Sequence, residues 1–186
     1  MPSPRRPRVL LIESMYHTDG EELLAAHTDV HVLSDATDDQ IREAIRTASA
    51  VAVRYPSRLR GAAIRAGSDL VVIATSGRGT DAIDVPVATE QGIAVVNIPG
   101  FGAAPVSEHT IALMLDLAKQ VTRSDARARR GDGWTDRNES SRIELEGRTL
   151  GLIGLGDIGT EVARKCVTAF RMRVLAYDPY VPPAKA

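Results

Sequence analysis

Three glycines at a fixed spacing, Gly154, Gly156 and Gly159, are the part of this sequence that points most directly to chemistry. They stand between an apolar run at 149–153 and a helical pattern at 160–170, the setting in which such a turn binds phosphate. The first glycine permits a tight turn, the second lets the backbone approach a pyrophosphate, and the third allows close packing of helix on strand. Free N–H groups at the helix N-terminus attract the same anion. We therefore expect a dinucleotide to bind at Gly154, Gly156, Asp157, Ile158 and Gly159.

An aspartate at the end of the next predicted strand completes this pattern. Residues 173–177 are predicted to form a strand that ends at Asp178, nineteen positions after Gly159. A carboxylate about twenty residues beyond the glycines accepts hydrogen bonds from the adenosine ribose hydroxyls and repels a 2′-phosphate. The sequence therefore predicts NAD, rather than NADP, as the cofactor. The alternative is a glycine turn and a strand-end aspartate without function, but the coincidence of strand, turn, helix and acid favours the dinucleotide site.

The elements that would position this turn follow from the hydrophobic pattern. Five near-continuous apolar runs precede it, as expected of strands buried on both faces of a sheet. These runs are 9–12, 30–33, 50–53, 70–74 and 93–96. The clearest helix signal between them is a capping box at Thr37 and Gln40, ahead of apolar residues at helical spacing. Strand, helix and strand repeated in this way predict a parallel sheet covered by helices.

The pattern changes after residue 100. No glycine or proline occurs from Val106 to Arg130, so this stretch is expected to form a helix of several turns that ends at Gly131. A polar connection follows, and a second lobe begins near Gly147. The expected organisation is a flexible tail at 1–7, an α/β lobe at 8–100, a long helix and connection at 101–146, and an incomplete second domain at 147–186.

Four stretches of the sequence, taken in order, resemble the signatures of one family. These stretches are 77–84, 92–100, 106–110 and 145–159. They are similar to the D-isomer-specific 2-hydroxyacid dehydrogenases, the phosphoglycerate dehydrogenase and hydroxypyruvate reductase-like proteins. The resemblance implies a flavodoxin-like parallel-sheet substrate lobe and, in this chain, the first strand, helix and strand of a Rossmann NAD-binding domain. It also implies NAD as hydride carrier, a 2-oxo or 2-hydroxy acid as substrate, and a homodimer.

The resemblance also assigns residues to the substrate. Ser76, Gly77, Arg78 and Gly79 form a turn whose backbone N–H groups would bind the substrate carboxylate, since such amides converge on one anion. Arg54, just after the run at 50–53, matches an arginine that reaches the substrate, and a solvated strand-end residue is the equal alternative. Arg54 and Arg78 together would suit a second anionic group, because arginine matches phosphate and carboxylate geometrically.

Three residues depart from the family pattern. Arg78 stands where a small residue is usual near the nicotinamide side, and either adds a cation there or points into water. Asp157 replaces an arginine beside the pyrophosphate, and its charge weakens phosphate binding unless the side chain turns outward. Arg171 replaces a glycine between helix and strand, where a positive φ would strain it.

The residues that carry the family's chemistry are not found in this sequence. The resemblance implies an arginine that holds the carboxylate and a histidine paired with a carboxylate, all from the later part of the nucleotide-binding domain. We therefore assign no catalytic or metal-binding residue, and expect a truncated chain that is inactive alone and leaves an open sheet edge and an uncovered apolar face at 149–153. The alternatives are an NAD-sensing, corepressor-like protein of the same family and a stand-alone substrate-lobe module.

Other residues that could do chemistry are given structural roles. Glu108 and His109 are interpreted as a helix-start carboxylate and a packed imidazole. Cys166 is expected in the core of the last helix. The net charge of -1 gives no electrostatic footprint for nucleic acid, and no apolar run approaches the ~20 residues of a membrane span. A single cysteine and no signal-peptide pattern favour the cytoplasm.

Overall fold

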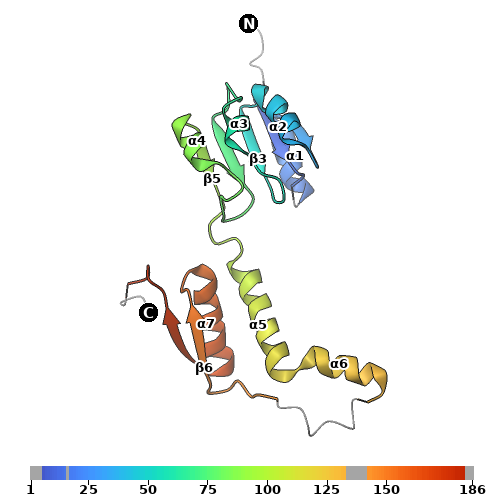
Figure 1. Cartoon of the computed structure of the whole chain (residues 1–186), viewed down its shortest axis with the longest axis vertical. Coiled ribbons are helices and arrows are strands. Elements are labelled where there is room, and N and C mark those ends of the chain that lie inside the picture. Colours follow the sequence, from blue (N-terminus) through green and yellow to red (C-terminus); the bar gives the residue numbers. More distant parts are fainter. Residues whose placement is uncertain (1–5, 16, 133–141, 183–186) are drawn as a thin grey trace. The chain divides into compact units, whose positions relative to one another are not determined.

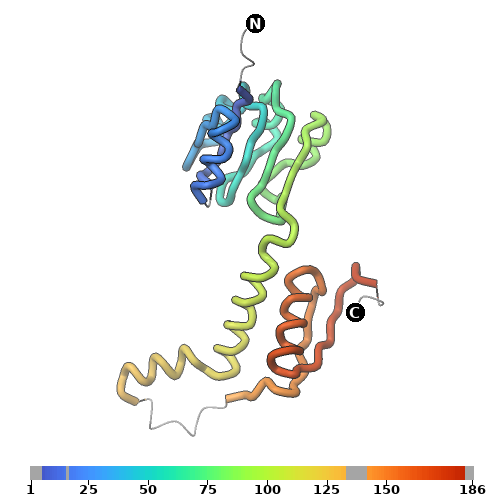
Figure 2. Tube along the Cα trace, turned by 180° about the vertical axis from the view of Figure 1, so that it is seen from behind, coloured from blue at the N-terminus to red at the C-terminus, as the bar shows by residue number. Residues whose placement is uncertain are grey.

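The computed structural model describes residues 6–15, 17–132 and 142–182. They form two compact units, one that extends to Phe101 and one that begins at Gly102, and each is described by itself. Figures 1 and 2 show both units from two sides. Most of the tail expected at 1–7, and most of the polar connection expected before residue 146, lie outside the described residues.

A parallel β-sheet of five strands forms the centre of the first unit (Figure 1). Its strands are β1 (Arg8–Ile12), β2 (Asp29–Leu33), β3 (Ala50–Val53), β4 (Val72–Thr75) and β5 (Ala94–Val96). Their spatial order is β2-β1-β3-β4-β5, and every neighbouring pair is parallel. This is the flavodoxin-like order, in which ligands bind at the carboxyl ends of the strands. The predicted α/β fold is confirmed.

Short helices connect the consecutive strands of this sheet. They are α1 (Thr18–His27), α2 (Asp38–Ala44), the 3-10 turn η1 (Ile45–Thr47), α3 (Gly61–Ile64) and α4 (Val85–Glu90). The predicted capping box starts α2: the Thr37 hydroxyl accepts from the Gln40 N–H at 3.3 Å, and the Gln40 side chain accepts from the Thr37 N–H at 2.8 Å. These bonds satisfy N–H groups that the start of a helix leaves without partners.

The core of the first unit lies along its central strands. Leu10, Leu11 and Ile12 of β1 are at most 1% exposed, as expected of a strand covered on both faces. The same expectation is wrong for the edge strands β2 and β5, where Val32 and Val96 are 41% and 50% exposed. An edge strand has a neighbouring strand on one side only, so less of its surface is covered.

Within its described residues, the second unit consists of three helices and a pair of parallel strands. They are α5 (Ala103–Lys119), α6 (Val121–Arg130), β6 (Thr149–Ile153), α7 (Asp157–Phe170) and β7 (Arg173–Tyr177). The helices α5 and α7 lie side by side in both views (Figures 1 and 2). A small buried cluster holds the unit together: Ala118, Leu145, Val162, Cys166 and Met172. Both strands span the predicted residues.

The prediction of one helix from 106 to 130 is wrong, because the chain forms two helices, α5 and α6, in this region. Gln120 between them has φ 53° and ψ 43°, the left-handed conformation, and this interrupts the helical path. The Asp116 carboxylate stabilises the new start, since it accepts from the N–H and the hydroxyl of Thr122 at 2.7 and 3.0 Å. The helix α6 then ends at Gly131, as predicted.

The two sides of the β6–β7 pair differ in burial. Leu150 and Leu152 pack against the buried cluster, whereas Ile153, Leu175 and Tyr177 are 95%, 69% and 68% exposed. The uncovered apolar face expected from the sequence is therefore present. Among the described residues β6 and β7 pair only with each other, and such a face beside open strand edges is a surface on which other chain segments can pack.

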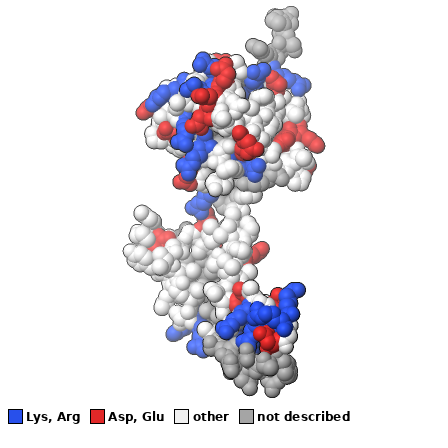
Figure 3. Space-filling model, turned by 45° about the vertical axis from the view of Figure 1, so that its right-hand side comes forward, with Lys and Arg blue, Asp and Glu red and all other residues white. Residues whose placement is uncertain are grey.

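Charged side chains of both signs are mixed over the first unit (Figure 3). On the second unit, basic residues gather on α6, whose last turn carries Arg127, Arg129 and Arg130. Arg129 pairs with Asp125 at 2.9 Å and Arg130 with Asp132 at 3.6 Å, so acidic neighbours offset part of this charge. In the part of the chain that is described, every helix is too short or too polar to cross a lipid bilayer.

Candidate functional site

The glycine turn between β6 and α7 has the local structure that its spacing predicts. Gly154 has φ 97°, a conformation that favours glycine, and its N–H donates to the Tyr177 carbonyl at 2.8 Å. A Cβ on Gly159 would clash with the carbonyl oxygen of Gly154, so α7 approaches the turn this closely only without a side chain there. A Cβ on Gly156 would meet no such neighbour within 4 Å, which leaves this stretch of backbone open to a ligand.

The N-terminus of α7 follows this turn and offers an anion site. The helix begins at Asp157, and its cap residue Gly156 has no side chain to satisfy the first N–H groups. Those groups have no partner inside the helix and carry the positive end of its dipole. Asp157 and Ile158 are both exposed in the first turn. A phosphate would therefore receive backbone hydrogen bonds here, with the Asp157 carboxylate in the same helical turn.

Asp178, at the end of β7, is in direct contact with the glycine turn. Its Oδ2 accepts from the Leu155 N–H at 2.7 Å, and its Oδ1 accepts from the Tyr180 N–H at 2.8 Å. The hydrogen bond from Leu155, followed by that from Tyr180, lowers the pKa of Asp178 below its ordinary value. Each carboxylate oxygen has a second acceptor position, so the group can still accept from ligand hydroxyls. The bond to Leu155 is a contact that the spacing of glycines and acid could not reveal.

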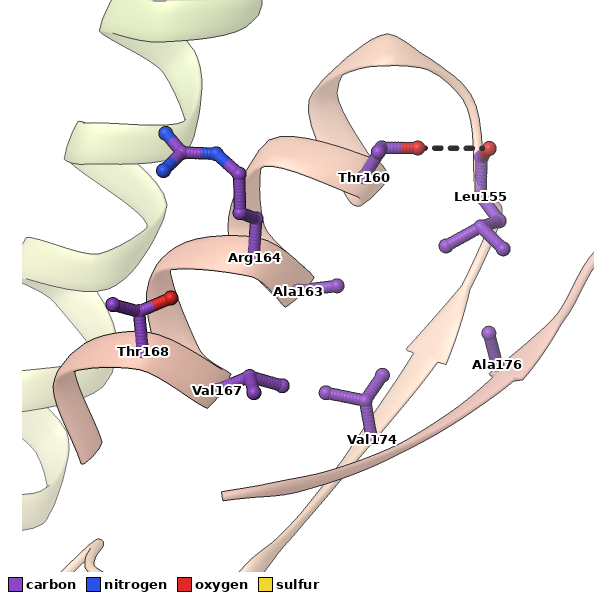
Figure 4. Close-up of a pocket in the computed structure, with 8 residues that line it drawn as sticks. All are labelled: Leu155, Thr160, Ala163, Arg164, Val167, Thr168, Val174 and Ala176. Carbon is purple, nitrogen blue, oxygen red and sulfur yellow. Dashed lines mark hydrogen bonds between the residues drawn. The ribbon is translucent and has the colours of Figure 1, made fainter. Parts of the chain in front are cut away.

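A pocket of about 440 Å³ adjoins this turn (Figure 4). Ala163 and Val167 of α7 point toward Val174 of β7 across it, and Ala176 adds a further methyl group. At the turn, the Thr160 hydroxyl donates to the Leu155 carbonyl at 3.3 Å. The N-terminus of α7, the candidate anion site, is thus bordered by an apolar wall, an arrangement suited to a ligand with one charged and one apolar part.

A second pocket, of about 430 Å³, lies in the first unit at the carboxyl ends of β1, β3 and β4. Of the predicted substrate residues, the structure brings Arg54, directly after β3, and Ser76, directly after β4, to this pocket. Gly77, Arg78 and Gly79 belong to the turn that continues from Ser76, but they do not line it. Arg54 and Arg78 therefore do not line the same pocket.

Asn97 is a residue whose role the sequence did not reveal. Its side-chain amide donates to the Arg78 carbonyl at 2.7 Å, and the neighbouring Ile98 N–H donates to the Gly77 carbonyl at 2.9 Å. The segment after β5 thus fixes the turn after β4 through two of its carbonyl groups. Asn97 lies in the stretch 92–100 that resembles the family, but that resemblance did not specify this partner.

Three other reactive residues, Glu108, His109 and Cys166, line neither of these pockets. His109 is exposed, so the expected packed imidazole is wrong, and helix α5 leaves that side chain on its outer surface. Oε1 of Glu108 lies 3.7 Å from Nζ of Lys165. That ammonium group also donates to the buried Ser107 hydroxyl at 2.6 Å. Cys166 is buried as expected, and burial raises the pKa of its thiol, which disfavours the thiolate. No cluster of three potential metal ligands occurs among the residues described.

A flavodoxin-like sheet, followed by a strand, a glycine turn and a helix, defines an α/β protein with a Rossmann-type dinucleotide-binding turn. Residues 9–177 match the family model of the D-isomer specific 2-hydroxyacid dehydrogenase catalytic domain. The chain therefore belongs to the D-isomer-specific 2-hydroxyacid dehydrogenase family, as its sequence motifs predicted.

Curated relatives support this membership. The chain is 38% identical over 173 residues to the D-3-phosphoglycerate dehydrogenase of Methanocaldococcus jannaschii. The aligned region covers 93% of this chain and 32% of that protein. It is 37% identical over 165 residues to the hydroxypyruvate reductase of Thermotoga maritima. This second aligned region covers 88% of this chain and 53% of that protein. The chain thus spans about a third of the first relative and about half of the second.

Solved structures give the same fold. A 2-hydroxyacid dehydrogenase from Ketogulonicigenium vulgare Y25 aligns with a TM-score of 0.81 and 29% identity over 98% of this chain and 57% of its own. The NADPH-dependent glyoxylate/hydroxypyruvate reductase of Sinorhizobium meliloti, in complex with NADP and malonate, aligns with a TM-score of 0.74 and 26% identity. That alignment covers 96% of this chain and 55% of the reductase. The family therefore includes structures that hold a nicotinamide dinucleotide.

Proposed function

We propose that this chain belongs to an NAD-dependent oxidoreductase that transfers hydride between NAD and a 2-oxo or 2-hydroxy acid. The observation that carries the proposal is the pairing of the glycine turn with Asp178, whose carboxylate accepts from the Leu155 N–H at 2.7 Å. The residues present fit the pyrophosphate and the adenosine ribose of a dinucleotide. When bound, NAD supplies the hydride acceptor or donor.

Each predicted residue has a binding role in this proposal. Backbone N–H groups at Gly156, Asp157, Ile158 and Gly159 receive the phosphates, and Gly154 permits the turn. Asp178 accepts from the ribose hydroxyls and disfavours a 2′-phosphate, which selects NAD over NADP. In the first unit, the turn formed by Ser76, Gly77, Arg78 and Gly79 binds the substrate carboxylate, with Arg54 beside it.

In this function, residues outside this sequence transfer the proton and polarise the substrate carbonyl. By family resemblance these are an arginine and a histidine paired with a carboxylate, so the 186-residue chain is inactive alone. The proposed whole protein is a homodimer that acts on a small molecule in the cytoplasm. The single cysteine favours that reducing compartment.

The gene and its full-length product test this function. Its coding sequence is expected to supply an arginine, an aspartate or glutamate, and a histidine within roughly one more small domain's length, about 130 residues. The product should oxidise NADH with 2-oxo acids and bind NAD at least about tenfold more tightly than NADP. Asp178→Ala should reduce that preference. NAD binding without turnover of any 2-oxo acid would instead indicate a non-catalytic NAD-sensing protein and contradict the enzyme.

A further inference from the structure

The pocket of the first unit is lined largely by exposed apolar side chains. Met15, Val96, Ile98 and Phe101 all line it, and they are 38%, 50%, 46% and 61% exposed. Val53, at the end of β3, lies at the same edge of the sheet and is buried. Apolar surface gathered in a concave place, with few polar groups among it, is typical of a site for a small molecule with an apolar part.

The charges that line this pocket are few and nearly balanced. Arg54 contributes a guanidinium, and Glu13 contributes a carboxylate from the loop after β1. That carboxylate is fixed in place, because its Oε1 accepts from the Ser57 hydroxyl at 2.7 Å and from the Asp35 N–H at 3.3 Å. A ligand that brings a single negative charge can use the guanidinium. A second or third negative charge would face the Glu13 carboxylate without a further cation from the described lining residues.

The imidazole of His17 adds no unbalanced positive charge. Its Nδ1 accepts from the Asp19 N–H at 3.3 Å, where it caps the start of α1. The same nitrogen lies 3.2 Å from Oδ1 of Asp19, so that carboxylate would offset a positive charge on the ring. Arg78, the other arginine near the substrate turn, does not line the pocket.

We infer that this pocket takes the side chain of a monoanionic 2-oxo acid with an apolar group of several carbons, and that it disfavours phosphorylated or dicarboxylic acids. The inference rests on the proposed function and specifies its substrate class. Ser76 and Arg54 hold the carboxylate end, while Ile98, Phe101 and Met15 contact the carbon chain. The expected substrate therefore differs in charge from the phosphorylated acid in the name of the Methanocaldococcus jannaschii relative.

Binding to this chain tests the substrate class without turnover. Amide correlation NMR spectra of the 186-residue chain would be titrated with pyruvate, 4-methyl-2-oxopentanoate and 3-phosphonooxypyruvate. Each buried methylene group contributes about 0.8 kcal/mol, a factor of roughly four, so 4-methyl-2-oxopentanoate should bind at least about tenfold more tightly than pyruvate. It should also bind more tightly than the phosphorylated acid. The largest shifts should occur at Ile98 and Phe101.

Two variants and one control sharpen the test. Ile98→Lys places a cation on the apolar wall, and Glu13→Gln removes the fixed carboxylate while retaining an acceptor for Ser57. Each should improve binding of the phosphorylated acid several-fold relative to 4-methyl-2-oxopentanoate. Val71→Lys is the matched control, because Val71 is 63% exposed, precedes the amino end of β4 and does not line the pocket. The control should keep the wild-type preference, and thermal melts would verify that all three variants fold.

The outcomes separate the two proposals. Tighter binding of 3-phosphonooxypyruvate by the wild-type chain overturns the apolar pocket and leaves the 2-oxo acid function standing. Failure of all three acids to bind both this chain and the full-length gene product, with or without NAD, overturns the proposed function together with this inference. An Ile98→Lys variant with the same preference as Val71→Lys would also contradict the assigned site.

Discussion

Gly156 and Gly159 belong to one turn but have different surroundings. A Cβ at Gly159 would clash with the Gly154 carbonyl, whereas one at Gly156 would meet no such neighbour within 4 Å. Gly159→Ala should therefore lower the free energy of unfolding of the second unit by about 1–3 kcal/mol, the usual cost of overpacking. Gly156→Ala should change it by no more than about 0.5 kcal/mol, as at a site without close neighbours. Urea unfolding followed by circular dichroism measures both.

The same pair separates folding from binding. In the full-length protein, Gly156→Ala should weaken NAD binding by tenfold or more, since its methyl group would occupy space that the pyrophosphate needs. Isothermal titration of NAD provides the measurement. Equal stability losses in the two variants, or unchanged NAD affinity in Gly156→Ala, would contradict the roles given to these glycines.

Asp178 gives the second unit a specific response to acid. Hydrogen bonds from the N–H groups of Leu155 and Tyr180 lower its pKa, so the unfolded state binds this proton more readily than the folded state. These bonds stabilise the folded state fully above the pKa that Asp178 has in the unfolded chain, about 3.9. The stabilisation is lost as the pH falls through the lower pKa of the folded state. NMR titration of the Asp178 carboxyl should place its midpoint below about 3.9. Asp178→Asn should remove this step, and a midpoint at or above the ordinary value would refute the contacts.

At the residue scale, the sequence predicts what depends on residue type and spacing. The local structure of the glycine turn could be predicted, because Gly154 with its positive φ and Gly159 with its close contact each answer a local geometric need. The bond from Asn97 to the Arg78 carbonyl could not be predicted, since it joins segments that only the parallel sheet brings together. The separation of Arg54 and Arg78 depends on the path of the turn after β4, which their sequence positions do not encode.

At the element scale, the capping box at the start of α2 gives a direct test. Thr37→Ala removes the acceptor for the Gln40 N–H and should lower the free energy of unfolding by about 1 kcal/mol. Thr37→Ser keeps the hydroxyl and should recover most of this loss. Chemical denaturation of the three proteins gives the comparison. If the serine and alanine variants were equally destabilised, the lost methyl packing rather than the cap would explain the effect.

Some elements of the fold follow from the sequence more directly than others. The strands 149–153 and 173–177 could be predicted because each apolar run ends at turn residues, Gly154 after the first and Asp178-Pro179 after the second. The division of 106–130 into α5 and α6 could not, since it occurs at Gln120, a residue type that carries no break signal. Arg171, with φ 51°, adopts the positive φ that was considered for this position. The glycine that is usual at this position in the family indicated this positive φ, whereas the conformational propensity of arginine did not.

At the scale of the whole molecule, the two units have unequal cores. The main cluster of the first unit contains sixteen buried residues and that of the second contains five, counted among the described residues. We expect two transitions in calorimetry, with the second unit melting first, because units with separate cores can unfold separately.

Cys166 provides the probe that assigns these transitions. Its thiol is buried in the smaller cluster, and burial raises its pKa, so it should resist alkylation in the folded chain. Alkylation should become rapid across the lower transition and change little across the upper one. A thiol that reacts only at the upper transition would show that the second unit is the more stable of the two.

The open face of β6 and β7 affects how the chain folds during its synthesis. Synthesis proceeds from the N-terminus at about 5–20 residues per second, so any strand placed later in a chain arrives seconds after Tyr177 has left the ribosome. During that interval the first unit can complete its core, while Ile153, Leu175 and Tyr177 stay in contact with solvent. The yield of native protein from such a chain would then depend on translation speed and on chaperones that bind nascent apolar segments, rather than on equilibrium stability alone.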